Sequence, residues 1–114
     1  MSFLDRLRGT PAPAPTPTEL ARRLGVPPPD GPRALELFGF RTCPYCQRVL
    51  RKAADLGLEI PWRDVHQDPT ASRELLRLTR GTQVPCLVID GQPLLESADI
   101  VAWLEIYKDH LPQA

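Results

Sequence analysis

The stretch that organises this sequence is Phe40-Arg41-Thr42-Cys43-Pro44-Tyr45-Cys46-Gln47-Arg48. Its two cysteines follow an apolar run, residues 34–40, and open an amphipathic segment that extends to Gly57. The apolar run has the length of a strand and carries no helix caps, so it predicts a buried strand. A Cys-x-x-Cys at a strand-to-helix junction is the arrangement that a dithiol redox site needs.

The spacing of the two cysteines predicts different roles for them. Cys43 falls at the first helical turn, where free backbone N–H groups and the helix dipole stabilise a thiolate. Cys46 is three residues further on, within reach of Cys43 but more buried, so we expect Cys43 to attack and Cys46 to resolve. Pro44 suits the first turn, where its missing N–H costs nothing. Arg41 and Arg48 flank the pair and add positive potential.

Two other interpretations of the cysteine pair stay open at this point. A zinc site needs four ligands, and the remaining candidates are Cys86, His66 and His110, with no second Cys-x-x-Cys in the sequence. We therefore expect no metal. The pair can also be two inert buried thiols. Independently of this choice, Cys86 is either a small core residue that enters the strand or a third thiol near the active pair.

Length and charge limit the class of protein. The chain has 114 residues, which is enough for one domain with a modest core. Its formal net charge is zero, which does not favour binding to nucleic acid. No apolar run approaches the roughly 18 residues that span a bilayer. The N-terminus does not resemble a secretory signal, and three cysteines do not suit a secreted disulfide framework. We expect a cytoplasmic protein.

Residues 1–33 differ in composition from the rest and contain eight of the fourteen prolines. This composition predicts a partly disordered, semi-extended N-terminal extension with short helices, followed by a domain over residues 34–114. One short helix is expected over residues 1–8. Another begins with Thr18 as its cap and ends at Gly25. We expect the extension to pack loosely on the domain rather than to act as a docking arm.

The first half of the domain continues with a strand and a helix after the Cys-x-x-Cys helix. Residues 58–65 predict a second strand, in which Pro61 indicates an edge position. Asp68-Pro69 predicts a helix start, because it combines a capping side chain with proline at the first turn. The inward side of this helix is expected to carry Leu75, Leu76 and Leu78.

The last third predicts a hairpin and a final helix. Residues 86–89 and 93–95 form strands around the tight turn Asp90-Gly91. Ser97 is expected to cap a helix whose core side carries Ile100, Val101, Leu104 and Tyr107. The order is β-α-β-α-β-β-α, which predicts a four-stranded mixed sheet with three flanking helices that cover both faces.

Two further segments can form a pocket beside the thiols. A proline at a strand entrance, as in Val84-Pro85, is either an ordinary trans loop residue or a cis residue beside which an extended peptide pairs with Val84. In Glu96-Ser97, a helix N-terminus with a hydroxyl binds a carboxylate, and an acidic side chain pairs with an ammonium group. The alternative for this second segment is plain capping.

Together, these motifs resemble those of glutaredoxins. Cys43-Pro44-Tyr45-Cys46 matches the dithiol motif of that family, and Val84-Pro85 matches its Val-(cis)Pro. Glu96-Ser97 resembles the Glu-Ser element of glutaredoxins close to the N-terminal domain of glutathione S-transferases. The resemblance covers roughly residues 34–110. It implies a thioredoxin-like fold, with glutathione as cosubstrate held by Arg41, Tyr45, Val84, Pro85, Glu96 and Ser97.

The implied activity is glutathione-dependent thiol–disulfide exchange. The chain would reduce protein–glutathione mixed disulfides and some protein disulfides as a monomer, with glutathione reductase recycling the glutathione. The sequence departs from the family at Phe40, where a lysine is usual, and at Gln83, where a threonine is usual.

Two alternative functions stay open. One is a dimer that binds a glutathione-ligated iron–sulfur cluster through Cys43, which Pro44 usually disfavours in this family. The other is transferase-like activity. The end of the chain soon after residue 110 counts against this alternative.

Overall fold

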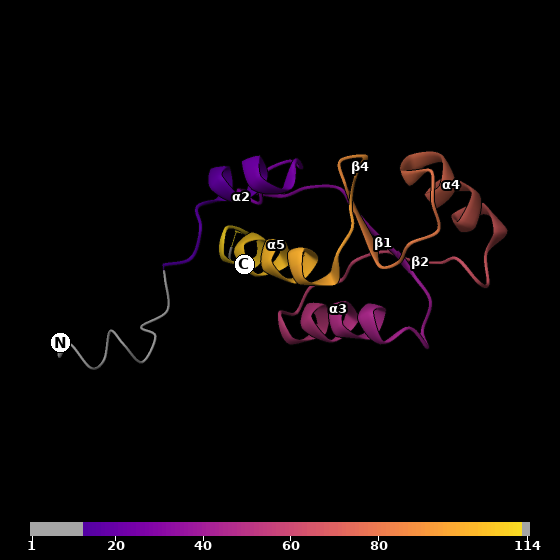
Figure 1. Cartoon of the computed structure of the whole chain (residues 1–114). Helices are drawn as coiled ribbons and strands as arrows, with labels where there is room; N and C mark the ends of the chain where they lie inside the picture. The colour runs from indigo at the N-terminus through magenta and orange to yellow at the C-terminus, as the bar shows by residue number, and fades with distance from the viewer. Residues whose placement is uncertain (1–12, 113–114) are drawn as a thin grey trace, which may run out of the picture.

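The computed structural model of the chain describes residues 13–112, and the helix expected over residues 1–8 lies outside them. The described residues contain a four-stranded sheet in the order β2-β1-β3-β4. Strand β1 (Leu35–Gly39) pairs in parallel with β2 (Trp62–Asp64) and antiparallel with β3 (Cys86–Ile89). Strand β4 (Gln92–Leu94) is antiparallel to β3. This is the mixed sheet of the predicted thioredoxin-like α/β fold (Figure 1).

Helices cover both faces of the sheet, as predicted. Alternate residues of β1 point to opposite faces, so Leu37 joins a core cluster with α3 (Pro44–Asp55) and α5 (Ser97–Asp109). Phe38 belongs to a second cluster that includes Ala71 and Leu75 of α4 (Pro69–Thr79). A fourth helix, α2 (Pro17–Leu24), packs beside α5 and corresponds to the short helix expected in the N-terminal extension (Figure 1).

The second strand lies at the edge of the sheet, as the proline indicated, but it is shorter than predicted. Only residues 62–64 of the expected segment 58–65 are paired as a strand. Pro61 comes immediately before the strand, and its carbonyl accepts a hydrogen bond of 2.9 Å from the N–H of Leu37. Residues 58–60 instead cross from the end of α3 toward this edge.

Helix α4 begins as predicted, with Asp68 as N-cap and Pro69 at the first position. The carboxylate of Asp68 accepts a hydrogen bond of 2.9 Å from the N–H of Thr70. The inward assignment of Leu76 was wrong, since this side chain is 53% exposed. Ala71 and Leu75 lie four residues apart on one face, and Leu76 is turned about 100° away from Leu75 on a helix of 3.6 residues per turn.

Two predicted helix caps lie elsewhere. The cap of α2 is Thr16 rather than Thr18, and it forms a capping box with Glu19 in which each side chain pairs with the other residue's N–H. The residue before α5 is Glu96, with a positive φ of 73°, and Ser97 is the first residue inside the helix. The predicted turn Asp90-Gly91 is present, and both its residues have positive φ.

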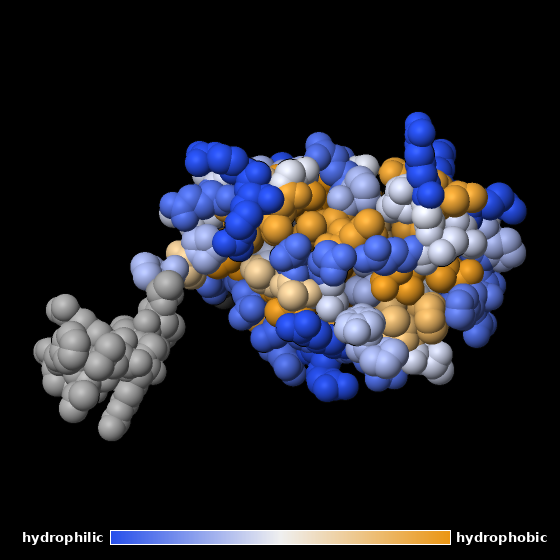
Figure 2. Space-filling view, viewed as in Figure 1, coloured by the Kyte–Doolittle hydropathy of each residue, from blue (hydrophilic) through white to orange (hydrophobic). Residues whose placement is uncertain are grey.

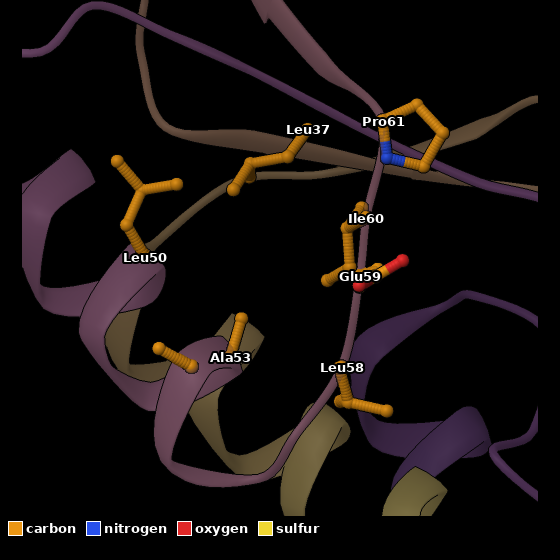
Figure 3. A pocket seen from close by; sticks show the side chains of 8 residues that line it. Leu37, Leu50, Ala53, Leu58, Glu59, Ile60 and Pro61 are labelled. Carbon is orange, nitrogen blue, oxygen red and sulfur yellow. The ribbon is translucent and has the colours of Figure 1, made fainter.

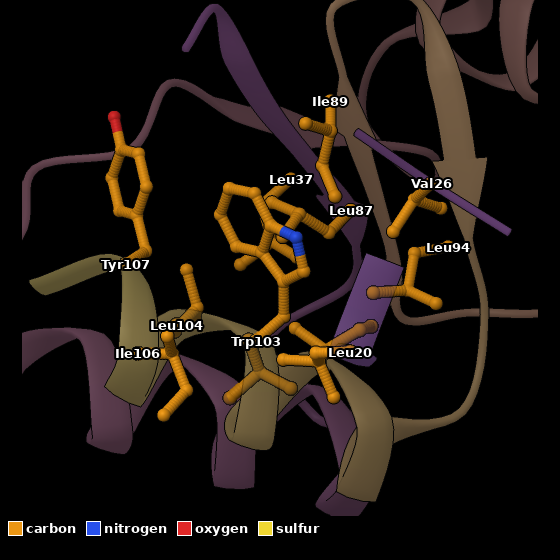
Figure 4. Close-up of a cluster of buried hydrophobic side chains, with 12 residues drawn as sticks. Leu20, Val26, Leu37, Leu87, Ile89, Leu94, Trp103, Leu104, Ile106 and Tyr107 are labelled. Carbon is orange, nitrogen blue, oxygen red and sulfur yellow. The ribbon is translucent and has the colours of Figure 1, made fainter. Parts of the chain in front are cut away.

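Residues 17–33 pack closely against the domain, so the expectation of loose packing was wrong. Leu20 is fully buried in the cluster that surrounds Trp103 (Figure 4). The indole N–H of Trp103 donates to the carbonyl of Pro27 at 2.9 Å. The N–H of Arg33 donates to the hydroxyl of Tyr107 at 3.2 Å. The division of the chain at residue 33 stays a prediction.

The face of the molecule seen in Figure 2 carries both polar and hydrophobic residues. Figure 2 shows polar side chains on the outer side of α2, and hydrophobic residues that reach the surface between α2 and α4. None of the helices in residues 13–112 is long and apolar enough to cross a membrane.

Candidate active site

The Cys-x-x-Cys motif lies where β1 leads into α3, as the sequence predicted. Cys43 is the N-cap of α3, and Pro44 occupies the first turn. The sulfur of Cys43 accepts a hydrogen bond of 3.5 Å from the N–H of Cys46. The thiol therefore takes the capping role that a serine or aspartate oxygen usually has at this position.

The three cysteines are all reduced in the structure and differ in their environments. Cys43 is 7% exposed, whereas Cys46 and Cys86 are fully buried. Burial raises the pKa of Cys46 to about 12, and a hydrogen bond from the backbone of Phe40 acts in the opposite direction. Burial also raises the pKa of Cys86 to about 11. Cys46 and Cys86 are therefore protonated at neutral pH.

Cys86 is a core residue on the far side of the sheet. It pairs with Phe38 across the β1–β3 ladder and shares the cluster that α4 covers. Cys46 lies instead on the α3 side, beside Gly39. Of the two interpretations of Cys86, the structure favours a small core residue.

A cavity of about 370 Å³ lies beside the start of α3. It brings together five of the six residues predicted to hold glutathione, together with Gln83, and its lining consists of Tyr45, Gln83, Val84, Pro85, Glu96 and Ser97. The peptide bond between Val84 and Pro85 is cis. The volume lies within the range of about 300–1,000 Å³ that is usual for small-molecule sites.

Polar contacts connect the elements that form this cavity. The guanidinium of Arg48, on α3, donates to the hydroxyl of Ser97 at 3.4 Å. The side-chain amide of Gln83 donates to the carboxylate of Glu96 at 3.2 Å. Gln83 was identified in the sequence only as a departure from the family pattern, and its contact with Glu96 was not foreseen.

Arg41 is not among the residues that line this cavity. It lines a neighbouring cavity of about 440 Å³ with Phe40, Thr42, Trp62, Asp64, His66 and Gln67. The guanidinium of Arg41 lies 5.7 Å from the centre of the Trp62 ring, and the rings of Phe40 and His66 stack at 3.9 Å. The indole N–H of Trp62 is buried and has no hydrogen-bond partner among residues 13–112.

A further cavity, with mostly apolar walls, is not part of this site. It has a volume of about 550 Å³ and lies between α3 and residues 58–61, where Leu37, Leu50, Ala53 and Ile60 form apolar walls (Figure 3). It contains none of the predicted site residues. Within residues 13–112, no three or more His, Cys, Asp or Glu side chains are grouped so that they can hold a metal ion.

Comparisons with known proteins place the chain in a family. Residues 37–109 match the model of the family described as "Glutathione S-transferase, N-terminal domain". A comparison with curated proteins found no match.

Three solved structures are similar. A rice glutathione S-transferase in complex with glutathione has 32% sequence identity and a TM-score of 0.54 over 63% of this chain and 32% of that chain. Oxidized glutaredoxin 2 from Chlamydomonas reinhardtii has 20% identity and a TM-score of 0.52 over 68% and 78% of the two chains. A mutant of a thioredoxin-like protein has 24% identity and a TM-score of 0.55 over 64% and 96%.

The last two show the fold alone, and the chain spans about a third of the length of the rice transferase. The family match begins within β1 and covers the Cys-x-x-Cys, helix α3, Glu96 and Ser97. The chain therefore belongs to the family of glutathione S-transferase N-terminal domains, with a thioredoxin-like fold.

Proposed function

We propose that this chain is a glutathione-dependent thiol–disulfide oxidoreductase of the glutaredoxin type. The observation that carries the proposal is the position of Cys43 as the N-cap of α3, next to the cavity that Tyr45, Val84, Pro85, Glu96 and Ser97 line. Cysteine thiols at helix N-termini are typically reactive. The cavity beside Cys43 has a volume suited to a small peptide.

The chemistry of the cavity suits the γ-glutamyl group of glutathione. The N-terminus of α5, with the Ser97 hydroxyl, attracts a carboxylate. The carboxylate of Glu96 is exposed and pairs with an ammonium group. The backbone of Val84 then pairs with the cysteinyl part, which brings the glutathione sulfur toward Cys43. Arg41, in the adjacent cavity, takes the glycine carboxylate.

The cycle consists of disulfide exchanges. The Cys43 thiolate attacks the glutathione sulfur of a protein mixed disulfide, so that a Cys43–glutathione disulfide forms and the protein leaves as a thiolate. A second glutathione thiolate attacks this disulfide, releases Cys43 and leaves as oxidised glutathione. In the dithiol route Cys46 attacks instead, and a Cys43–Cys46 disulfide forms while reduced glutathione is released.

The partners follow from this chemistry. They are glutathione and proteins that carry a glutathione mixed disulfide or an accessible disulfide, with glutathione reductase acting indirectly on oxidised glutathione. The chain acts as a cytoplasmic monomer without a metal. A glutathione-ligated iron–sulfur dimer is the alternative, and a visible iron–sulfur absorption band after anaerobic purification would support that alternative instead.

An assay that couples glutathione, glutathione reductase and a mixed-disulfide substrate tests the proposal. We expect turnover in the wild type, none in Cys43→Ser, and largely retained deglutathionylation in Cys46→Ser, which serves as the matched control. Turnover that survives Cys43→Ser would contradict the proposal.

Conjugation of glutathione to an electrophile is a second candidate, favoured by the family match over residues 37–109. A direct conjugation assay separates the two. If the protein conjugates glutathione to a model electrophile and Cys43→Ser retains that activity, transferase chemistry is the function.

A further inference from the structure

Gly39 is the last residue of β1 and lies directly against the resolving cysteine. A Cβ atom on Gly39 would lie 2.6 Å from the sulfur of Cys46 and 3.3 Å from its Cβ. It would also lie 2.9 Å from Cη2 of Trp62. Since real Cβ atoms essentially never approach another heavy atom within 3.0 Å, the sulfur occupies space that only a glycine leaves free.

The backbone of Gly39 is held in place, so it cannot withdraw to make room for a side chain. Gly39 pairs with Asp64 in the parallel ladder between β1 and β2. Its carbonyl accepts a hydrogen bond of 2.9 Å from the N–H of Val65. Trp62 closes the other side. A methyl group at residue 39 would therefore displace the Cys46 sulfur, the Trp62 ring, or both.

We propose that Gly39 is a positioning residue for the resolving thiol: its missing side chain allows the Cys46 sulfur to lie against β1, in the place from which it reaches Cys43. This inference rests on the proposed function, because it concerns the dithiol branch of the same cycle. In that branch the Cys46 thiol loses its proton to solvent and attacks the Cys43 sulfur. The bond between Cys43 and glutathione breaks, and glutathione leaves as a thiolate that takes up a proton.

The first step of the cycle does not use the Cys46 sulfur, so the two steps respond differently to a change at residue 39. Because a methyl group at residue 39 also presses on Trp62 beside Arg41, Gly39→Ala is expected to slow deglutathionylation through Cys43 less than it slows disulfide closure. It is expected to slow closure of the Cys43–Cys46 disulfide by about tenfold, as overpacking of a close contact does when it opposes the reactive geometry. Gly31→Ala is the matched control, because a Cβ on Gly31 meets nothing within 4 Å.

The experiment measures both steps on the full chain. Closure is followed by loading Cys43 with glutathione, quenching with acid at intervals, alkylating free thiols and counting them by mass spectrometry. A larger loss of closure than of deglutathionylation in Gly39→Ala, with wild-type values in Gly31→Ala, supports the inference. Unchanged closure, or an equal loss of both steps, would overturn it.

Two further measurements distinguish a failure of the inference from a loss of stability and from a failure of the proposed function. If Gly39→Ala folds poorly, the double variant with Cys46→Ala must recover part of the lost stability, because it removes the closest of the three contacts. Equal destabilisation with and without the Cys46 sulfur would overturn the role of Gly39.

If the wild type turns over no mixed disulfide, the proposed function fails. The equilibrium between Cys43–Cys46 dithiol and disulfide in glutathione redox buffers then still decides the inference. Gly39→Ala must lower the equilibrium constant for disulfide formation about tenfold relative to Gly31→Ala, and equal constants overturn it.

Discussion

Leu20→Ala tests whether the N-terminal helix α2 is an integral part of the folded unit. Leu20 is fully buried and packs in the cluster around Trp103 (Figure 4). Removing a buried leucine side chain costs about 2–5 kcal/mol, because hydrophobic transfer energy is lost and a cavity is left. A central loss of about 3 kcal/mol corresponds to a fall in Tm of about 10–25 °C for a domain of roughly 100 residues.

The assay is thermal and urea unfolding followed by far-ultraviolet circular dichroism. Leu76→Ala is the matched control, because Leu76 lies on α4 but is 53% exposed, and its loss should change the free energy of unfolding by about 0.5 kcal/mol or less. If Leu20→Ala is as mild as Leu76→Ala, helix α2 is not part of the cooperative core, and residues 34–114 form the folding unit by themselves.

Three further predictions concern charge, thiol reactivity and the cavity. Hydrogen bonds from the Ala34 N–H and, to a smaller extent, from Arg33 lower the pKa of Asp90 in the folded protein. The ionised carboxylate therefore stabilises the fold fully above the pKa of about 3.9 that aspartate has in the unfolded chain. This stabilisation is lost as the pH falls through the lower pKa of the folded state. Asp90→Asn should therefore reduce the free energy of unfolding by less than about 1 kcal/mol at pH 7, and urea titrations should show the difference shrinking below about pH 4. Burial raises the pKa of Cys46 to about 12, so iodoacetamide at pH 8 should leave Cys46 unmodified in the folded protein and modify it after unfolding. Peptide mass mapping locates the modified cysteines. Modification of Cys46 in the folded protein would contradict its buried position. Ser97→Ala should raise the KM for glutathione about 3- to 10-fold through loss of a hydrogen bond to the carboxylate, and an unchanged KM would remove Ser97 from the site.

The position of the dithiol was predictable because all of its determinants are local. The apolar run before Cys43, the proline in the first turn and the amphipathic segment after it all lie within residues 34–57. The same holds for the start of α4, where Asp68 and Pro69 supply both the cap and the first turn.

The errors arise where distant parts of the chain decide local structure. Ser97 was expected to cap α5, but its hydroxyl accepts a hydrogen bond from Arg48, which is 49 residues away. The role of Trp103 was not predicted, since its burial depends on Leu20 and the carbonyl of Pro27. A signal was present, however, because α5 is apolar on nearly all sides, and such a helix is usually buried.

The cap of α2 shows an error of a different kind. Thr16 and Thr18 are both threonines near a helix start, and Thr18 was chosen as the cap. The spacing of Thr16 and Glu19 is that of a capping box, with Pro17 at the first helical position. The information was therefore in the sequence, and the capping-box pattern decides between the two threonines.

The central claim is that Cys43 exchanges its sulfur partner with glutathione. The most direct test is to incubate Cys46→Ser with oxidised glutathione and to locate the bound glutathione by mass spectrometry of its peptides. The account predicts one glutathione per chain, on Cys43, which reduced glutathione removes. Glutathione bound at Cys86, or no stable adduct at Cys43, would contradict it.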